Sequence, residues 1–138
     1  MPADTPQAAE DAFYDALETG QLDQVMAAWD PGDEIACLLP MQEMVRGRKA
    51  VQETFRRLFQ AMGGLDIRVT HLHWAVWADT ALHVVGEQLT DPDGVAAGPP
   101  LYAVNVYRRR EGRWALALHQ NAPAPPPAGV LQPGAVPR

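Results

Sequence analysis

Five polar residues lie on apolar, alternating segments in the second half of the chain, where they could carry acid–base chemistry. His83 and Glu87 are four positions apart, so in a strand both lie on one face. Asn105 interrupts an apolar segment and needs a hydrogen-bond partner if it is buried. His119 and Asn121 share a face with small residues, which leave room for a ligand. An imidazole beside a carboxylate can act as acid and base near neutral pH.

Two interpretations of these residues stay open. In the first, they meet in an apolar pocket that binds and transforms a small molecule. Its catalytic candidates are His83, Glu87 and His119. Its candidates for ligand contact are Trp29, Leu39, Met41, Met44, Phe55, Asn105, Tyr107 and Asn121. In the second, the polar side chains form a satisfied internal network that fixes the register of the strands. Which strand faces point into the pocket is not determined by the sequence.

The sequence predicts neither a metal site nor a cofactor. His71 and His73 lie on one strand face with a spacing that suits zinc or iron, but no further ligand has diagnostic spacing. Cys37 is the single cysteine, which rules out an intrachain disulfide and suits a reducing cytosol. Because it lies in an apolar run, we expect Cys37 to fill the core and to be an unreactive thiol.

Length and composition indicate one globular domain. The chain has 138 residues, 47% of them hydrophobic, and a net charge of −6, which argues against a nucleic-acid partner. The acidic start lacks the features of a signal peptide, and no apolar run reaches membrane-spanning length, so we expect a cytoplasmic protein without membrane contact. We place the domain at residues 1–122 and a tail rich in Pro, Ala and Gly at residues 123–138.

Apolar spacing in the first half of the chain predicts three helices and one short strand. The helices run from Thr5 to about Gly20, from Leu22 to Trp29, and from Gly47 to Gly63. The segment 34–40 is too short for a helix and too apolar for a loop, so it is predicted to be a buried strand. A loop over residues 41–47 should connect that strand to the third helix.

From Leu65 onward the apolar period changes to two, which predicts strands. The apolar residues take odd positions from Leu65 to Val69 and even positions from Leu72 to Ala78. A β-bulge near Thr70 would explain this switch by adding one residue to a long, bent strand. Further strands are predicted over residues 81–90, 101–110 and 113–121, the last two as a hairpin.

The strand over residues 101–110 carries apolar or aromatic side chains on both faces. Leu101, Ala103 and Tyr107 lie on one face, and Tyr102, Val104 and Val106 on the other. The helices can cover one of these faces only. We therefore expect a homodimer in which a second subunit covers the outer face of the sheet.

This order of elements resembles the nuclear transport factor 2-like superfamily, and most closely its small polyketide cyclase-like and ketosteroid isomerase-like bacterial proteins. The resemblance rests on the segments FYDALETGQLDQVMAAWD, VRGRKAV, VVGEQL, AVNVYRR and GRWALALHQNAP. It implies an α+β cone, in which three N-terminal helices pack on a curved, mostly antiparallel sheet with a long bent strand and a C-terminal hairpin. It also implies one apolar pocket per subunit.

The chain departs from this family at positions that carry its chemistry. Ketosteroid isomerases place an aspartate base before the proline that ends the first strand, where this chain has Leu39, so their mechanism is not expected here. Their oxyanion-hole tyrosine aligns with Phe13, although Tyr14 is adjacent. The expected function is binding of a small, largely apolar molecule, with cofactor-independent isomerase, dehydratase or cyclase activity left open. The alternatives are an association module or a ligand carrier without catalysis.

Overall fold

The first helix follows directly from its local sequence signals. In the computed structural model, which describes residues 3–125, α1 (Pro6–Thr19) begins after Thr5. The Thr5 hydroxyl accepts a hydrogen bond from the backbone N–H of Ala8 at 3.0 Å and caps the helix. The helix ends at Gly20, where a φ of 70° lies in the left-handed region that glycine adopts without steric cost.

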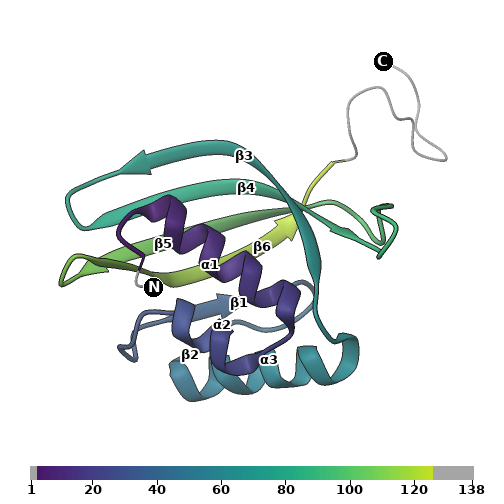
Figure 1. Cartoon of the computed structure of the whole chain (residues 1–138), viewed down its shortest axis with the longest axis horizontal. Helices are drawn as coiled ribbons and strands as arrows, with labels where there is room; N and C mark the ends of the chain where they lie inside the picture. Colours follow the sequence, from purple (N-terminus) through teal and green to yellow (C-terminus); the bar gives the residue numbers. More distant parts are fainter. Residues whose placement is uncertain (1–2, 126–138) are drawn as a thin grey trace.

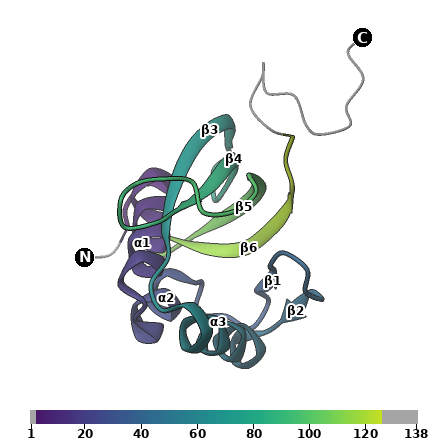
Figure 2. The same cartoon turned by 90° about the vertical axis from the view of Figure 1, so that its right-hand side faces the viewer.

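The other two helices also form where the apolar spacing predicts them. They are α2 (Leu22–Ala28) and α3 (Arg48–Met62), so all three predicted helices are confirmed. α1 crosses one face of the sheet, with α2 and α3 below it (Figure 1). A view turned by 90° shows α1 and α3 on the same side of the curved strands (Figure 2).

Six strands form one open sheet in the order β2-β1-β6-β5-β4-β3. Every neighbouring pair is antiparallel except β1 and β6, which run parallel. The α+β class predicted from the sequence, with three helices on a mostly antiparallel sheet, is therefore confirmed. The strands are β1 (Ala36–Leu38), β2 (Val45–Arg46), β3 (Asp66–Val76), β4 (Thr80–Thr90), β5 (Leu101–Arg110) and β6 (Arg113–Pro123).

The prediction of a simple loop over residues 41–47 is wrong in one respect. Two of its residues, Val45 and Arg46, form β2 and pair with Cys37 and Ala36 of β1. A strand of two residues is too short to show the alternation from which strands are recognised in a sequence. The buried strand predicted over residues 34–40 is confirmed as β1, although its paired part is shorter.

The predicted β-bulge lies in β3, two residues beyond the expected position. The pairing of β3 with β4 shifts register between His71 and His73, which leaves Leu72 as the additional residue. Before the shift Val69 pairs with Glu87, and after it Trp74 pairs with His83. Odd-numbered residues of β3 therefore face the helices before the bulge and even-numbered residues after it, as the apolar pattern indicated.

Strand alternation divides the sheet into an inner and an outer face. On β4 every second residue from Ala81 to Glu87 is buried against the helices, whereas the residues between them are only partly buried. On β5 the same alternation buries Ala103, Asn105 and Tyr107. The polar residues His83, Glu87 and Asn105 therefore lie on the inner face, under the helices.

The core between helices and sheet is aromatic at its centre. Phe13 makes edge-to-face contacts with Trp29 and Phe55, with ring centroids 6.1 and 6.2 Å apart. Cys37 is buried in the same core, and burial raises the pKa of its thiol to about 12, so its predicted core-filling role is confirmed. Within the described part of the chain, no helix combines the length and apolar character needed to cross a membrane.

The predicted boundary between domain and tail falls inside the last strand. β6 continues to Pro123, one residue into the predicted tail of residues 123–138. Residues 126–138 of that tail lie outside the described part of the chain.

Candidate ligand-binding site

A cavity of about 260 Å³ lies between the helices and the inner face of the sheet. It sits at the end of the core nearest the last turn of α3, beside the start of β5. Its wall is predominantly apolar and comprises Phe13, Leu17, Leu39, Pro40, Phe55, Leu58, Met62, Leu65, Ile67, Leu89, Pro99 and Leu101. A hollow of this volume lies just below the usual range for ligand sites, which extends from about 300 to 1,000 Å³.

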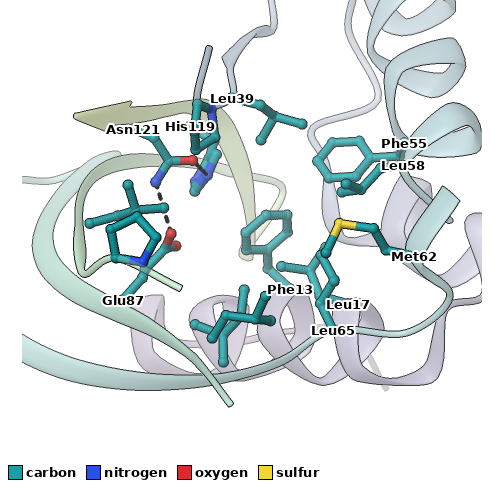
Figure 3. A pocket seen from close by; sticks show the side chains of 15 residues that line it. Phe13, Leu17, Leu39, Phe55, Leu58, Met62, Leu65, Glu87, His119 and Asn121 are labelled. Atoms are coloured by element: carbon teal, nitrogen blue, oxygen red, sulfur yellow. Dashed lines mark hydrogen bonds between the residues drawn. The ribbon is translucent and has the colours of Figure 1, made fainter. Parts of the chain in front are cut away.

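Among the described residues, three side chains of the sheet form the polar part of the wall. Glu87 of β4 and His119 and Asn121 of β6 line the cavity together. Figure 3 shows them at one end of the cavity, with Asn121 between the other two, whereas Phe55, Leu58 and Met62 lie at the opposite end. The cavity thus has one polar end and one apolar end.

These three side chains belong to a closed ring of hydrogen bonds. Asn121 Nδ2 donates to Glu87 Oε1 at 2.8 Å, and the Tyr14 hydroxyl of α1 donates to Glu87 Oε2 at 2.6 Å. Asn105 Nδ2 donates to the Tyr14 oxygen at 2.9 Å. His119 closes the ring with Nδ1 at 2.6 Å from Asn105 Oδ1 and Nε2 at 2.9 Å from Asn121 Oδ1.

These hydrogen bonds place an acceptor at each nitrogen of the His119 ring. Asn121 Nδ2 donates both to Glu87 and to the backbone carbonyl of Tyr102 at 3.0 Å, so Asn121 turns its oxygen to the imidazole. Because Tyr14 donates to Glu87, its oxygen accepts from Asn105, which likewise turns its oxygen to the imidazole. Both ring nitrogens of His119 then face acceptors, an arrangement that a doubly protonated imidazole satisfies. In that form His119 would pair with the Glu87 carboxylate through the amide of Asn121.

The Tyr14 hydroxyl is held in its protonated form. Burial, the nearby charge of Glu87 and the hydrogen bond to that carboxylate raise the pKa of Tyr14 far above its usual value, and the bond from Asn105 offsets this only in part. Tyr14 therefore acts as a permanent donor to Glu87.

A second polar cluster lies further along α1, away from the cavity. The buried carboxylate of Glu10 contacts His83 Nδ1 at 3.1 Å and His71 Nε2 at 2.7 Å, and Gln7 donates to it at 3.0 Å. Burial raises the pKa of Glu10, but the hydrogen bonds from His83, His71 and Gln7 outweigh burial and leave the pKa below 4.5. The cluster joins α1 to β3 and β4.

His83 is packed as a structural residue in this cluster. Its ring stacks on Trp74 with centroids 3.9 Å apart and is completely buried. Among the described residues nothing hydrogen-bonds to its Nε2, so the hydrogen bond of the ring is the one between Nδ1 and Glu10. His83 does not line the cavity.

The structure divides the residues predicted as the site into three groups. Leu39, Phe55, Glu87, His119 and Asn121 line the cavity together. Asn105 lies behind its polar end as a member of the ring. The rest lie off the cavity wall: His83, Trp29 and Tyr107 are buried in the core, and Met41 and Met44 are exposed.

The exposure of the two methionines follows from the loop that carries them. Met41 is fully exposed, with a φ of 62°, and borders a neighbouring hollow of about 370 Å³ that shares Leu39 and Asn121 with the cavity. Met44 is 40% exposed. Both methionines are among the residues predicted to contact a ligand, but sequence spacing could not show that their side chains turn outward.

Two polar residues of α1 are missing from the predicted site, although both bind its members. Tyr14 completes the ring through Glu87, and Glu10 pairs with His83. Their spacing in the sequence could have indicated this role. Glu10 and Tyr14 are four positions apart, as are the apolar residues Phe13 and Leu17, so the two pairs form adjoining stripes on one face of the helix. A carboxylate within an apolar stripe indicates a buried partner.

Three helices packed on a six-stranded, mostly antiparallel sheet form the α+β fold that the resemblance to the nuclear transport factor 2-like superfamily implies. A family model described as a SnoaL-like domain matches residues 7–125, and the chain belongs to that family. The resemblance inferred from the sequence is thereby confirmed. A search of curated proteins found no significant match.

Solved structures show the same fold. One, provisionally assigned as a calcium/calmodulin-dependent protein kinase type II association domain from Thiobacillus denitrificans, is 39% identical, covers 91% of this chain and 99% of its own, and has a TM-score of 0.84. A provisionally assigned dehydratase of the nuclear transport factor 2-like family from Streptomyces avermitilis is 26% identical, with coverages of 87% and 94% and a TM-score of 0.76.

A third structure supports the fold alone. The ketosteroid isomerase-like protein from Erwinia carotovora atroseptica is 19% identical, covers 87% of this chain and 94% of its own, and has a TM-score of 0.69. Named activities among these neighbours thus differ, although the fold is shared.

Proposed function

We propose that the protein binds a small, largely apolar molecule in the cavity between α1, α3 and the sheet. The observation that carries this proposal is the combination of an apolar hollow of about 260 Å³ with a single polar end formed by Glu87, His119 and Asn121. A protein that needed only a packed core would gain stability by filling such a hollow with side chains.

The chemistry that we propose at the polar end is cofactor-independent proton transfer, of the kind used by isomerases, dehydratases and cyclases. Glu87 is the carboxylate among the lining residues, and the hydrogen bonds from Tyr14 and Asn121 fix its orientation at the cavity wall. Leu39, at the position of the ketosteroid isomerase base, contributes an apolar surface to the same cavity.

Filling the cavity should abolish binding. We expect bicyclic and tricyclic apolar compounds to raise the melting temperature of the wild-type protein by several degrees, since a ligand at 100 times its Kd adds about 2.7 kcal/mol. In Leu58→Trp the larger side chain occupies the hollow, and the shift should disappear. Thermal shift and calorimetric titration measure both effects.

The control for this test is Leu72→Trp, the same substitution on the exposed β-bulge of β3. It should keep the ligand-induced shift. If no compound stabilises the wild type, or if Leu58→Trp responds as the wild type does, the cavity is not a binding site.

A second candidate function, an association module, is supported by the outer face of the sheet. Val84, Val104 and Val106 lie next to one another on neighbouring strands and are only partly buried, and Tyr102 beside them is 37% exposed. The 39% identical structure carries the assignment of an association domain. We propose that this face joins two copies of the chain in a homodimer, which is compatible with a ligand in each cavity.

The homodimer makes a direct prediction. Val104→Arg places a charge at the centre of the outer face and should convert a dimer into a monomer, because an unpaired charge in an apolar interface is costly. Sedimentation at micromolar concentration measures the change, with Val95→Arg on an exposed loop as the control that leaves the dimer intact. A wild-type protein that sediments as a monomer at this concentration would contradict the proposal.

A further inference from the structure

We propose that the polar end of the cavity, as the described residues form it, offers hydrogen-bond acceptors and no free donor, so that its ligand is a neutral apolar molecule that presents a hydroxyl group, as in an alcohol or phenol. This inference rests on the proposed function and specifies the chemistry of its ligand. It follows from which hydrogen-bonding positions of Glu87, His119 and Asn121 are already used within the protein.

Every side-chain donor at the polar end has an acceptor inside the protein. Both N–H groups of the Asn121 amide are used, one by Glu87 and one by the carbonyl of Tyr102. Both nitrogens of His119 face amide oxygens at 2.6 and 2.9 Å, so neither is free to donate outward. The Tyr14 proton is directed to Glu87 at 2.6 Å. A carbonyl or ether oxygen of a ligand would find no proton there.

Glu87 and Asn121 at the polar end of the cavity can, in contrast, accept further hydrogen bonds. The two oxygens of Glu87 have roughly four lone-pair positions and receive two hydrogen bonds, from Asn121 and Tyr14. Asn121 Oδ1 receives one, from His119. The lining of the same cavity includes Pro40 and Pro99, which have no backbone N–H. A hydroxyl group of a ligand can therefore donate to Glu87 without breaking a bond of the ring.

The charges at the polar end select against charged ligands. The single amide of Asn121 separates the Glu87 carboxylate from the His119 ring, and a doubly protonated His119 would balance the charge of that carboxylate. A ligand carboxylate would be repelled by the lone pairs of Glu87. A ligand ammonium would lose its hydration beside a carboxylate whose charge is then already balanced within the protein. A neutral donor avoids both costs.

The test compares ligands of nearly the same shape that differ in the donor. We expect wild-type protein to bind 2-naphthol roughly tenfold more tightly than either 2-methoxynaphthalene or naphthalene, because one hydrogen bond to a carboxylate accounts for such a ratio. The methyl ether is larger and the hydrocarbon smaller, so an affinity that only rises or only falls with ligand size cannot favour the hydroxyl over both. The anion 2-naphthoate should bind more weakly than all three. Fluorescence titration measures the four dissociation constants.

A variant locates the preference at Glu87. In Glu87→Gln the amide is isosteric but carries two protons of its own, so the preference for naphthol over its methyl ether should fall to about onefold. Glu10→Gln makes the same change in the second cluster, away from the cavity, and should keep the preference.

Equal affinity for naphthol and the methyl ether, or tighter binding of 2-naphthoate, would overturn the inference and leave the proposed function standing. Failure of all four compounds to bind the wild type would overturn the proposed function itself, and the inference with it. The wild-type comparison decides the matter even if Glu87→Gln does not fold.

Discussion

Replacing Glu87 with alanine is expected to lower the free energy of unfolding by about 3–5 kcal/mol, the usual cost of removing one member of a buried charge pair. The substitution leaves a doubly protonated His119 without its counter-charge. It also leaves the Tyr14 hydroxyl and one N–H of Asn121 without their acceptor. Urea unfolding at pH 7 measures the loss.

Glu87→Gln should lower the free energy of unfolding far less, by about 0.5–1.5 kcal/mol. In this variant several hydrogen bonds of the ring can exchange donor and acceptor, so that none of them is lost. The new amide would donate a hydrogen bond to the Tyr14 oxygen, and the Tyr14 hydroxyl would then donate to the Asn105 oxygen. The Asn105 N–H would donate to Nδ1 of His119, so the His119 ring would be neutral. NMR of the imidazole nitrogens separates the two states: His119 should be doubly protonated in the wild type and singly protonated in the variant. The exposed His73 provides the reference signal. A neutral His119 in the wild type would contradict the charge assignment.

Most of the fold could be predicted because its causes are local in the sequence. The Thr5 cap, the left-handed Gly20 and the 3.6-residue apolar spacing determine α1 without reference to other elements. The parity switch in β3 predicted a bulge because only an additional residue can keep apolar side chains on one face of a bent strand. β2 was missed since its stability comes from pairing with β1 and not from its own two residues.

The site was predictable only in part, because strand alternation tells which face a residue occupies but not which partner it meets. His83 and Glu87 share the inner face of β4, as predicted, yet four residues of strand separate them by about 13 Å. Each meets a different residue of α1, Glu10 for His83 and Tyr14 for Glu87. The placement of α1 on the sheet is tertiary information that local periodicity does not contain.

The second large effect concerns this other cluster and depends on pH. At pH 7, Glu10→Gln is expected to lower the free energy of unfolding by about 1.5–3 kcal/mol, because hydrogen bonds to a charged group are lost at His83 and His71. The pKa of Glu10 is lowered in the folded protein relative to 4.5. The carboxylate's contribution is therefore fully present above pH 4.5 and is lost as the pH falls through the folded-state pKa.

The difference in the free energy of unfolding between wild type and Glu10→Gln should consequently shrink in acid, because the protonated carboxyl group of the wild type resembles the amide. Urea unfolding of both proteins from pH 7 downward measures this convergence, with Glu18→Gln on the exposed side of α1 as the matched control. That control should show no comparable gap at any pH, because Glu18 is exposed to solvent. A gap for Glu10→Gln that stays constant as the pH falls would mean that the Glu10 charge does not stabilise the fold. The cluster would then stabilise the junction of α1 with β3 and β4 through packing alone, chiefly through the stacked rings of Trp74 and His83.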